Sequence, residues 1–371
     1  MYKDSYKPTY FRELNSLRFI GFIGILFGHV FFNHNLELIS SRFYIILQKY
    51  GKILGFVSLD SFFVLSSFLI TWKALEELQF SKNFNLKYFL IRRSLRIWPL
   101  YFLVVFLGFM TIYISYYFNE VTNELPSFYS FLFFILNYDI IKNGYEFLFF
   151  MVFLWSISVE EQFYVFWALV LKWFNKKLLA ISIILIISSL MFRCFYLKET
   201  LHLNFNTLST LGNFGIGAII ALFAFKKNKL YRIVKDLSSV QILLIYLIMA
   251  VVFIAAPKLL EFDLFIIFQR LIFSIFFAFI ILEQSYCDNS ILKFSRIRFF
   301  DFFGKISFGL YCYHGIVITI ILNFNYNDSL VFNILVYPIL IFILTLLVSY
   351  VSYRFYETKF LKLKSKFSLS N

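Results

Sequence analysis

The sequence predicts an all-α, polytopic integral membrane protein of about ten transmembrane helices with both termini in the cytoplasm. Of its 371 residues, 61% are hydrophobic and only 15% are charged, whereas soluble domains carry about 25% charged residues. The apolar runs continue for about twenty residues and lack the strict alternation of membrane β-barrel strands. Lipid is therefore the predicted solvent for most of the chain.

Ten apolar stretches have the length of a membrane span. They lie at about 15–34, 53–72, 97–118, 148–171, 178–196, 207–225, 238–256, 264–283, 303–323 and 331–353. A shorter run at 127–141 predicts an interfacial or re-entrant segment. No hydrophilic stretch is long enough for a second domain, so we expect a single membrane domain over 1–371, with its core at about 11–360 and no additional soluble domain.

The distribution of Lys and Arg supports this count, because cytoplasmic loops are enriched in basic residues. With the N-terminus inside, the basic residues gather in the inside segments 3–18, 73–96, 172–177, 226–235, 293–305 and 354–366. The outside segments hold few of them: Arg42, Lys49, Lys52, Lys142, Arg193, Lys198 and Lys258. Topology thus explains the net charge of +14, and nucleic acid is not an expected partner.

The three cysteines, Cys194, Cys287 and Cys312, lie far apart and form no CxxC motif. This spacing predicts neither a disulfide framework nor a zinc site. We expect no metal ion.

Ionisable side chains inside membrane spans cost about 2.5–3.5 kcal/mol on insertion scales, so each is a candidate functional residue. The candidates are His29, Asp60, Glu160, Glu161, Arg270 and His314, with Arg18 at the inner end of the first span. Arg18 and His29 are eleven residues apart, which returns them to one helix face within about 20° and roughly 16 Å apart along the axis. His29 suits a general base for a hydroxyl group; a core histidine bonded to a backbone carbonyl is the alternative.

The other candidates each leave two interpretations open. Asp60 could orient and charge the imidazole of His29, or cap a helix near the outer interface. Glu160 and Glu161 point about 100° apart, so at least one should face a polar cavity; the alternative is a structural ion pair with Arg270. His314 is either a further site residue or part of an aromatic girdle.

Three arginines, Arg92, Arg93 and Arg96, stand at the cytoplasmic start of the third predicted span. Arg93 and Arg96 share a helix face, and paired guanidinium groups are well suited to bind phosphate. The alternative is that they serve only the inside-positive topology.

Six segments, taken together and in order, resemble membrane acyltransferase family 3, whose members O-acetylate surface polysaccharides. They are Arg12 to Ile20 followed by Gly28-His29, then Ser58 to Thr71, Phe89 to Tyr101, Trp155 to Tyr164, Phe303 to His314, and Tyr353 to Phe360 around Glu357. The sequence departs from the family pattern at Asn15, where aspartate is usual, at Ser67, where glycine is usual, and at Thr358-Lys359, which replaces Arg-Pro.

The resemblance implies an acyl donor, acetyl-CoA, on the cytoplasmic side and a glycan or lipid-linked oligosaccharide acceptor, with the O-antigen foremost. Arg93 and Arg96, with Arg18 and Arg92, would hold the phosphates of CoA. His29 would act as a base or as a transient acyl carrier, and Asp60, Glu160 and Glu161 would belong to the catalytic cavity. The implied location is the bacterial cytoplasmic (inner) membrane.

Two other functions fit the composition. A lipid-linked glycan flippase or other transporter typically shows two similar halves with Gly- or Pro-broken helices, whereas this sequence has five prolines and no internal repeat. A glycan polymerase is expected to carry a large outside loop, and the longest one here, at about 119–147, is modest. Acyl transfer is therefore the favoured function.

Overall fold

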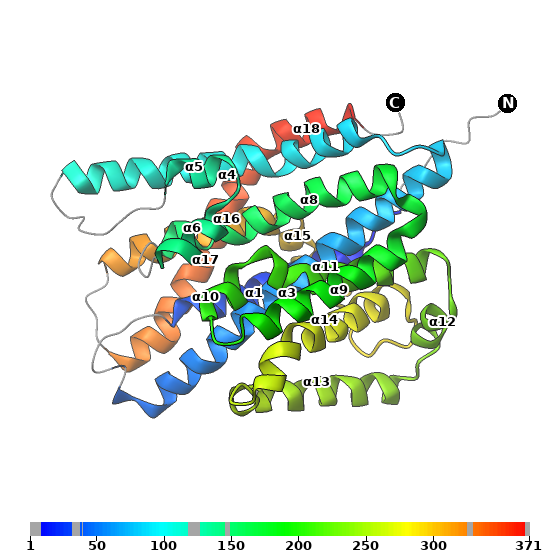
Figure 1. Ribbon diagram of the computed structural model, residues 1–371. Helices are drawn as coiled ribbons and strands as arrows, with labels where there is room; N and C mark the ends of the chain where they lie inside the picture. The colour runs from blue at the N-terminus through cyan, green and yellow to red at the C-terminus, as the bar shows by residue number, and fades with distance from the viewer. Residues whose placement is uncertain are drawn as a thin grey trace.

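The computed structural model of the protein describes residues 9–31, 38, 40–117, 127–144, 149–324 and 329–367. Every regular element in these ranges is helical, which confirms the all-α prediction. The long helices lie side by side in one bundle (Figure 1). Both ends of the described chain lie at one end of this bundle, because the Thr9 N–H donates to Glu76 while Arg92 binds both Glu77 and the carbonyl of Phe367. The side of the membrane that this end faces remains a prediction.

Each of the ten predicted spans overlaps a long helix, and residues 32–34, 118 and 148 of these spans lie outside the described ranges. The helices that overlap them are α1 (Arg12–Val30), α3 (Arg42–Ser81), α4 (Leu86–Tyr117), α8 (Trp155–Trp173), α9 (Leu178–Phe195), α11 (Thr207–Phe225), α13 (Ser239–Leu259), α14 (Asp263–Tyr286), α16 (Ser307–Phe324) and α17 (Tyr337–Ser352). In the described ranges, seven helical segments are long and apolar enough to span a membrane, or eight if one bent pair counts as a span. Helices α1 and α8 are not among the seven.

Helix α3 extends past the hydrocarbon layer. Its 40 residues correspond to about 60 Å, against about 30 Å for the apolar core of a bilayer. The helix begins after Ser41, whose hydroxyl oxygen accepts from the Tyr44 N–H, and ends at Lys82 in the left-handed conformation. The last turns of α3 lie at the bundle end that holds both chain ends, because they contain Glu76 and Glu77.

The remaining helices are short connectors. The run at 127–141 forms α5 (Phe128–Leu132) and α6 (Leu136–Asn143), neither of which could cross a bilayer, as predicted. The fourth span is broken into α7 (Phe149–Val152) and α8. Helices α10 (Thr200–Phe205) and α12 (Lys229–Lys235) join longer elements.

The predicted span at 303–323 contains a sharp bend that its hydropathy did not indicate. Helix α15 (Arg298–Lys305) is bent by 77° from α16. Asp301 of α15 accepts hydrogen bonds from Arg12 and Asn15 of α1 at 3.3 and 3.0 Å, and from Lys305 at 3.0 Å. These bonds hold α15 against the start of α1 and turn it away from the axis of α16.

Helix α17 also departs from a simple span, because one π-helical turn precedes it at Phe332–Val336 and another follows it at Tyr353–Glu357. The chain then continues as α18 (Thr358–Ser365). Single π-turns inside longer helices are frequent at functional sites. The second π-turn contains Glu357, which accepts a hydrogen bond from Ser352.

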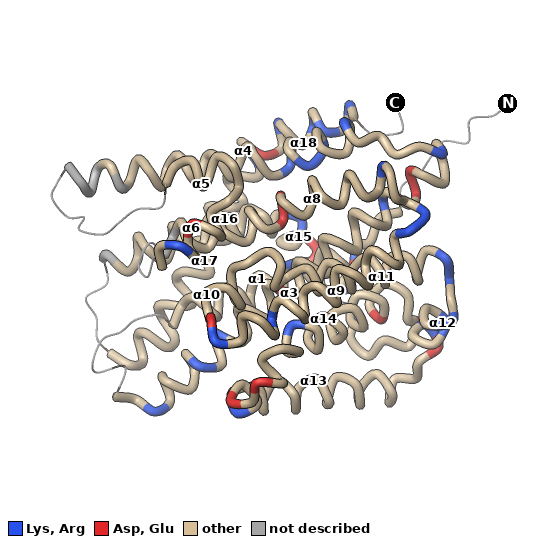
Figure 2. The backbone as a smooth tube through the Cα atoms, viewed as in Figure 1, with Lys and Arg blue, Asp and Glu red and all other residues tan. Residues whose placement is uncertain are grey.

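The periphery of the bundle is apolar. On α13, Val240, Leu244, Leu247 and Val251 are each more than half exposed. Exposed apolar faces of this size are rare on water-soluble monomers but suit contact with lipid tails. Lys and Arg concentrate at the bundle end that carries α12 and α18 (Figure 2), the end predicted to be cytoplasmic.

The contact between α3 and α11 depends on a glycine. Ser67 is fully buried and donates to the Phe214 carbonyl at 2.6 Å. A Cβ on Gly217 would lie 2.2 Å from the Val64 carbonyl oxygen and 2.8 Å from the Ser67 Cβ. Serine at position 67, the departure from the family pattern, is thus accommodated by a glycine on the facing helix.

We expect Gly217→Ala to lower the melting temperature of the detergent-solubilised protein, because the new methyl group must displace backbone atoms, at a cost of about 1–3 kcal/mol. The matched control is Gly212→Ala in the same helix, where a Cβ meets only the Ser189 side chain at 3.3 Å. Equal melting temperatures for the two variants would show that the contact between α3 and α11 is loose.

Candidate functional site

A cavity of about 260 Å³ opens between α1, α3, α4 and α18 at the end of the bundle that holds both chain ends. We call it the cationic cavity. Its lining includes seven basic residues: Arg18, Lys73, Arg92, Arg93, Arg96, Lys305 and Lys364. None of the described residues that line it is acidic. Such a wall attracts a polyanion.

The arginines that line the cationic cavity differ in the hydrogen bonds and ion pairs that they form. Arg92 binds Glu77 at 3.1 Å and the Phe367 carbonyl at 2.8 Å. Arg93 lies over the rings of Phe89 and Tyr164, 5.6 and 5.1 Å from their centroids. Within the described part of the chain, neither Arg93 nor Arg96 donates a hydrogen bond to another residue. Their N–H groups thus remain for a ligand, while Arg92 chiefly anchors the C-terminal segment.

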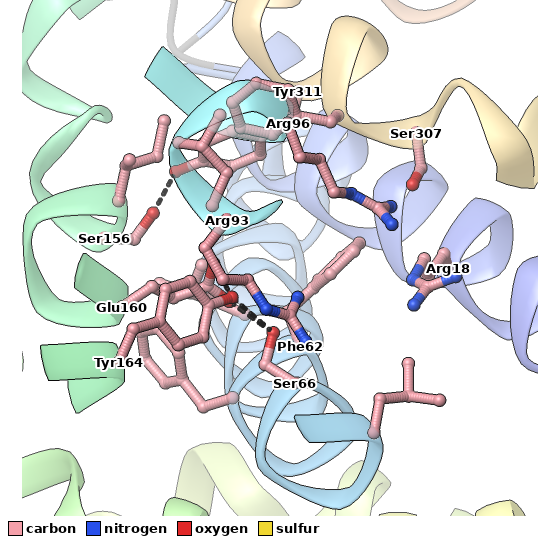
Figure 3. Close-up of a pocket in the computed structure, with 16 residues that line it drawn as sticks. Arg18, Phe62, Ser66, Arg93, Arg96, Ser156, Glu160, Tyr164, Ser307 and Tyr311 are labelled. Carbon is pink, nitrogen blue, oxygen red and sulfur yellow. Dashed lines mark hydrogen bonds between the residues drawn. The ribbon is translucent and has the colours of Figure 1, made fainter. Parts of the chain in front are cut away.

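A second, smaller cavity of about 80 Å³ adjoins the first and shares Arg18, Arg93 and Arg96 with it. We call it the inner cavity. Figure 3 shows the three guanidinium groups turned toward one space. Glu160 also lines this cavity. Helix α4 therefore presents Arg93 and Arg96 to both cavities, as expected for residues that share a face.

Glu160 is held by two hydroxyl groups. Ser66 donates to its Oε1 at 2.8 Å, and Tyr164, one turn further along α8, donates to its Oε2 at 3.0 Å (Figure 3). Glu161 instead accepts from the Trp98 indole at 3.1 Å and is not among the residues that line the inner cavity. The prediction that at least one of the two glutamates faces a polar cavity is confirmed.

His29 bonds to His314. The His29 Nδ1 and the His314 Nε2 lie 3.0 Å apart, and His314 has no exposed surface. Arg18 shares the inner cavity with Ser307 of α16, so both predicted residues of α1 face α16, as their spacing indicated. His29 is not among the residues that line the inner cavity.

Tyr311 connects the histidine pair to the inner cavity. Its hydroxyl donates to the Phe153 carbonyl at 2.6 Å and lies 2.6 Å from the Ser156 hydroxyl. Tyr311 and Ser156 both line the cavity, and the Tyr311 carbonyl bonds to the His314 Nδ1 at 2.5 Å. One turn of α16 thus separates the end of this cavity from the histidines.

Asp60 has different neighbours from those expected. Arg270 donates to its Oδ1 at 2.8 Å and Asn213 donates to the same atom at 2.6 Å. The interpretation that Asp60 orients His29 is wrong, and so is the helix-cap interpretation, because Asp60 lies in the middle of α3. The suggested ion pair between Arg270 and a glutamate is also wrong, since Arg270 pairs with Asp60. The packing of α3 against α14 determines this pairing, and the spacing of residues in the sequence does not predict which helices pack together.

We expect Arg270→Ala to destabilise the protein by about 3–5 kcal/mol, because it leaves the Asp60 carboxylate unpaired in a buried site. The two side chains are only 5% and 7% exposed. The double variant D60N/R270Q should lose less stability than the sum of the single variants, measured by thermal unfolding in detergent. A double variant that loses as much stability as the two single variants together would show that Asp60 and Arg270 do not stabilise each other.

Several residues of the site escaped the sequence analysis. Tyr164 lies four residues after Glu160, and this helical spacing could have indicated its role. Tyr311 lies three residues before His314, which is also a helical spacing, whereas Ser66 had no such signal. Lys73, Lys305 and Lys364 were assigned only to topology, and the fold brings them to the cationic cavity from three different helical segments.

Comparison with known proteins gives one family and a set of relatives. A family model described as an acyltransferase domain matches residues 11–354. The O-acetyltransferase OatA of Staphylococcus aureus strain NCTC 8325 / PS 47 is 26% identical over 382 residues, which cover 95% of this chain and 57% of that protein. OatA of strain COL gives the same values. The chain thus spans less than two thirds of the length of these relatives, and no solved structure matches it significantly.

Proposed function

Because the chain belongs to the acyltransferase 3 family, we propose that it is a multi-pass O-acetyltransferase that moves an acetyl group from cytoplasmic acetyl-CoA to a hydroxyl group of a cell-surface polysaccharide or of its lipid-linked precursor. The O-antigen is the foremost acceptor, and the bacterial inner membrane is the proposed location. The observation that carries the proposal is the cationic cavity, where the N–H groups of Arg93 and Arg96 bond to none of the described residues and lie beside a further set of basic side chains.

The chemistry of this cavity fits the donor. Coenzyme A carries several phosphate groups, and guanidinium groups bind phosphate through strong, paired hydrogen bonds. With the phosphates in the cationic cavity, the thioester end would extend past Arg18 into the inner cavity and toward His29. The separation of roughly 16 Å between Arg18 and His29 along α1 suits the reach of the pantetheine arm.

The proposed reaction needs one base. His29 removes the proton from the acceptor hydroxyl while that oxygen attacks the carbonyl carbon of the thioester. The carbon–sulfur bond then breaks, and the CoA sulfur leaves and recovers the proton from the imidazole. Glu160, held by Ser66 and Tyr164, lies beside Arg93 at the inner cavity, where it would help to place the arginine side chains.

A cell-based experiment tests this function. Surface glycans from cells with and without the gene are compared by mass spectrometry, and purified protein is assayed for release of CoA thiol from acetyl-CoA in the presence of the acceptor. We expect the glycan to gain the mass of one acetyl group per modified sugar. An unchanged acetyl content together with altered chain length or surface display would instead favour a polymerase or a flippase.

A further inference from the structure

The imidazole rings of His29 and His314 meet edge to edge between α1 and α16. The His29 Nδ1 and the His314 Nε2 are 3.0 Å apart, the ring centroids are 5.2 Å apart, and the ring planes differ by only 15°. An N···N distance of this size between nearly coplanar rings indicates one N–H···N hydrogen bond. One ring must donate this bond and the other must accept it.

The Tyr311 carbonyl decides which ring is the donor. A carbonyl oxygen can only accept, and the His314 Nδ1 lies 2.5 Å from it, so this nitrogen carries a hydrogen. Since a neutral imidazole has one N–H, the Nε2 of His314 has a lone pair and accepts from the Nδ1 of His29. In a neutral pair, the lone pair of His29 is then on its Nε2.

We propose that His314 is a positioning residue that holds His29 as its Nδ1–H tautomer, so that the lone pair that would take up the hydroxyl proton is on the Nε2 of His29. This inference rests on the proposed function of His29 in acetyl transfer. The hydrogen bond made by one ring nitrogen sets which nitrogen of a histidine is protonated. Free histidine side chains in water favour the opposite, Nε2–H form, in which the Nε2 could not accept a proton.

The position of His314 is itself fixed by its neighbours. The Phe153 ring packs beside the His314 ring, with centroids 4.6 Å apart, and the Phe153 carbonyl accepts from the Tyr311 hydroxyl. Phe153 lies at the break between α7 and α8, so this break anchors both the side chain and the carbonyl that orient His314. These contacts connect His314, and through it the tautomer of His29, to the wall of the inner cavity.

The experiment uses the full-length protein in detergent, labelled with ¹⁵N in its imidazole rings. With four histidines in the chain, the spectrum is simple, and single substitutions assign the signals. We expect both His29 and His314 to show a protonated Nδ1 and a non-protonated Nε2 in the unmodified protein. A protonated Nε2 on His29 in that spectrum would overturn the proposal.

Two variants separate orientation from packing. His314→Leu removes the acceptor, so we expect His29 to change to its Nε2–H form and the transfer rate at saturating acetyl-CoA to fall about 10- to 100-fold, the usual cost of losing a group that orients an imidazole. His314→Gln can still accept from His29 through its amide oxygen and should retain most of the rate. Equal rates for the two variants, or an unchanged His29 tautomer in His314→Leu, would overturn the proposal.

His202→Gln is the matched control, because His202 lies on α10 and pairs with Glu199 instead. It should change neither the His29 signals nor the rate. If His314→Leu fails to fold, the unmodified spectrum and the His314→Gln rate still decide the question. If the unmodified protein transfers no acetyl group, the proposed function fails, while the spectrum still reports whether His314 sets the tautomer of His29.

Discussion

His29→Ala is expected to lower the rate of acetyl transfer at saturating acetyl-CoA by about 100- to 10,000-fold, the range supplied by a positioned general base. The variant removes the imidazole that would accept the hydroxyl proton. It leaves the cationic cavity untouched, because His29 lies on the same face of α1 as Arg18 but several turns further along the helix. Binding of acetyl-CoA should therefore be preserved. The measurement is the initial rate of CoA release with the purified protein and its acceptor.

His202→Ala serves as the histidine control, since that side chain lies on α10 near Glu199. Circular dichroism and thermal unfolding are the controls that test whether both variants fold. Full residual activity of folded His29→Ala would remove His29 from the reaction. Incubation with radiolabelled acetyl-CoA in the absence of acceptor addresses the alternative role, because label that stays on the unmodified protein, but not on His29→Ala, would identify an acyl carrier.

The double variant Arg93→Ala/Arg96→Ala is expected to raise the KM for acetyl-CoA by more than about 100-fold. Each hydrogen bond to a charged partner contributes about 1.5–3 kcal/mol, and Arg93 and Arg96 are the two guanidinium groups that both cavities share with Arg18. The turnover rate should change much less, because neither side chain lies at the histidine pair. Substitution by lysine should restore only part of the affinity, since an ammonium group cannot bind phosphate in a bidentate way.

Comparison with acetyl-3′-dephospho-CoA sharpens this test. If the cavity binds the phosphates, the unmodified protein should prefer the complete donor, and the double variant should lose much of that preference. Lys229→Ala, an exposed lysine of α12, controls for a general loss of positive charge. A double variant that lowers only protein yield, with an unchanged KM, would show that these arginines serve topology alone.

The fold was largely predictable because a lipid solvent leaves a strong signal in sequence. Each of the ten apolar stretches of spanning length overlaps a helix in the described ranges, and the short run at 127–141 was correctly separated from them. The bend before α16 was missed, because it arises from Asp301 binding Arg12 and Asn15 nearly three hundred residues away. Hydropathy indicates whether a segment is surrounded by lipid or by water, but it does not indicate contacts between distant side chains.

The sequence predicted which residues belong to the candidate site better than it predicted which of them contact each other. Burial of charge in lipid is costly, and this rule alone selected His29, Asp60, Glu160 and His314. Helix packing determined which of these side chains contact one another. His29 forms a hydrogen bond with His314, 285 residues away, whereas Asp60 forms an ion pair with Arg270. The roles of these residues in catalysis remain predictions that the variants above test.

Helix α18 matters for how the proposed donor site is studied and how it could diverge. Lys364 contributes to the wall of the cationic cavity, and Arg92 binds the Phe367 carbonyl. Lys364 and Phe367 both lie beyond residue 354, where the family match ends. Donor affinity could thus drift between relatives through a tail that family motifs do not constrain. If the cationic cavity binds the donor as proposed, a cut within α18 would lower the affinity for the donor even when every motif is intact.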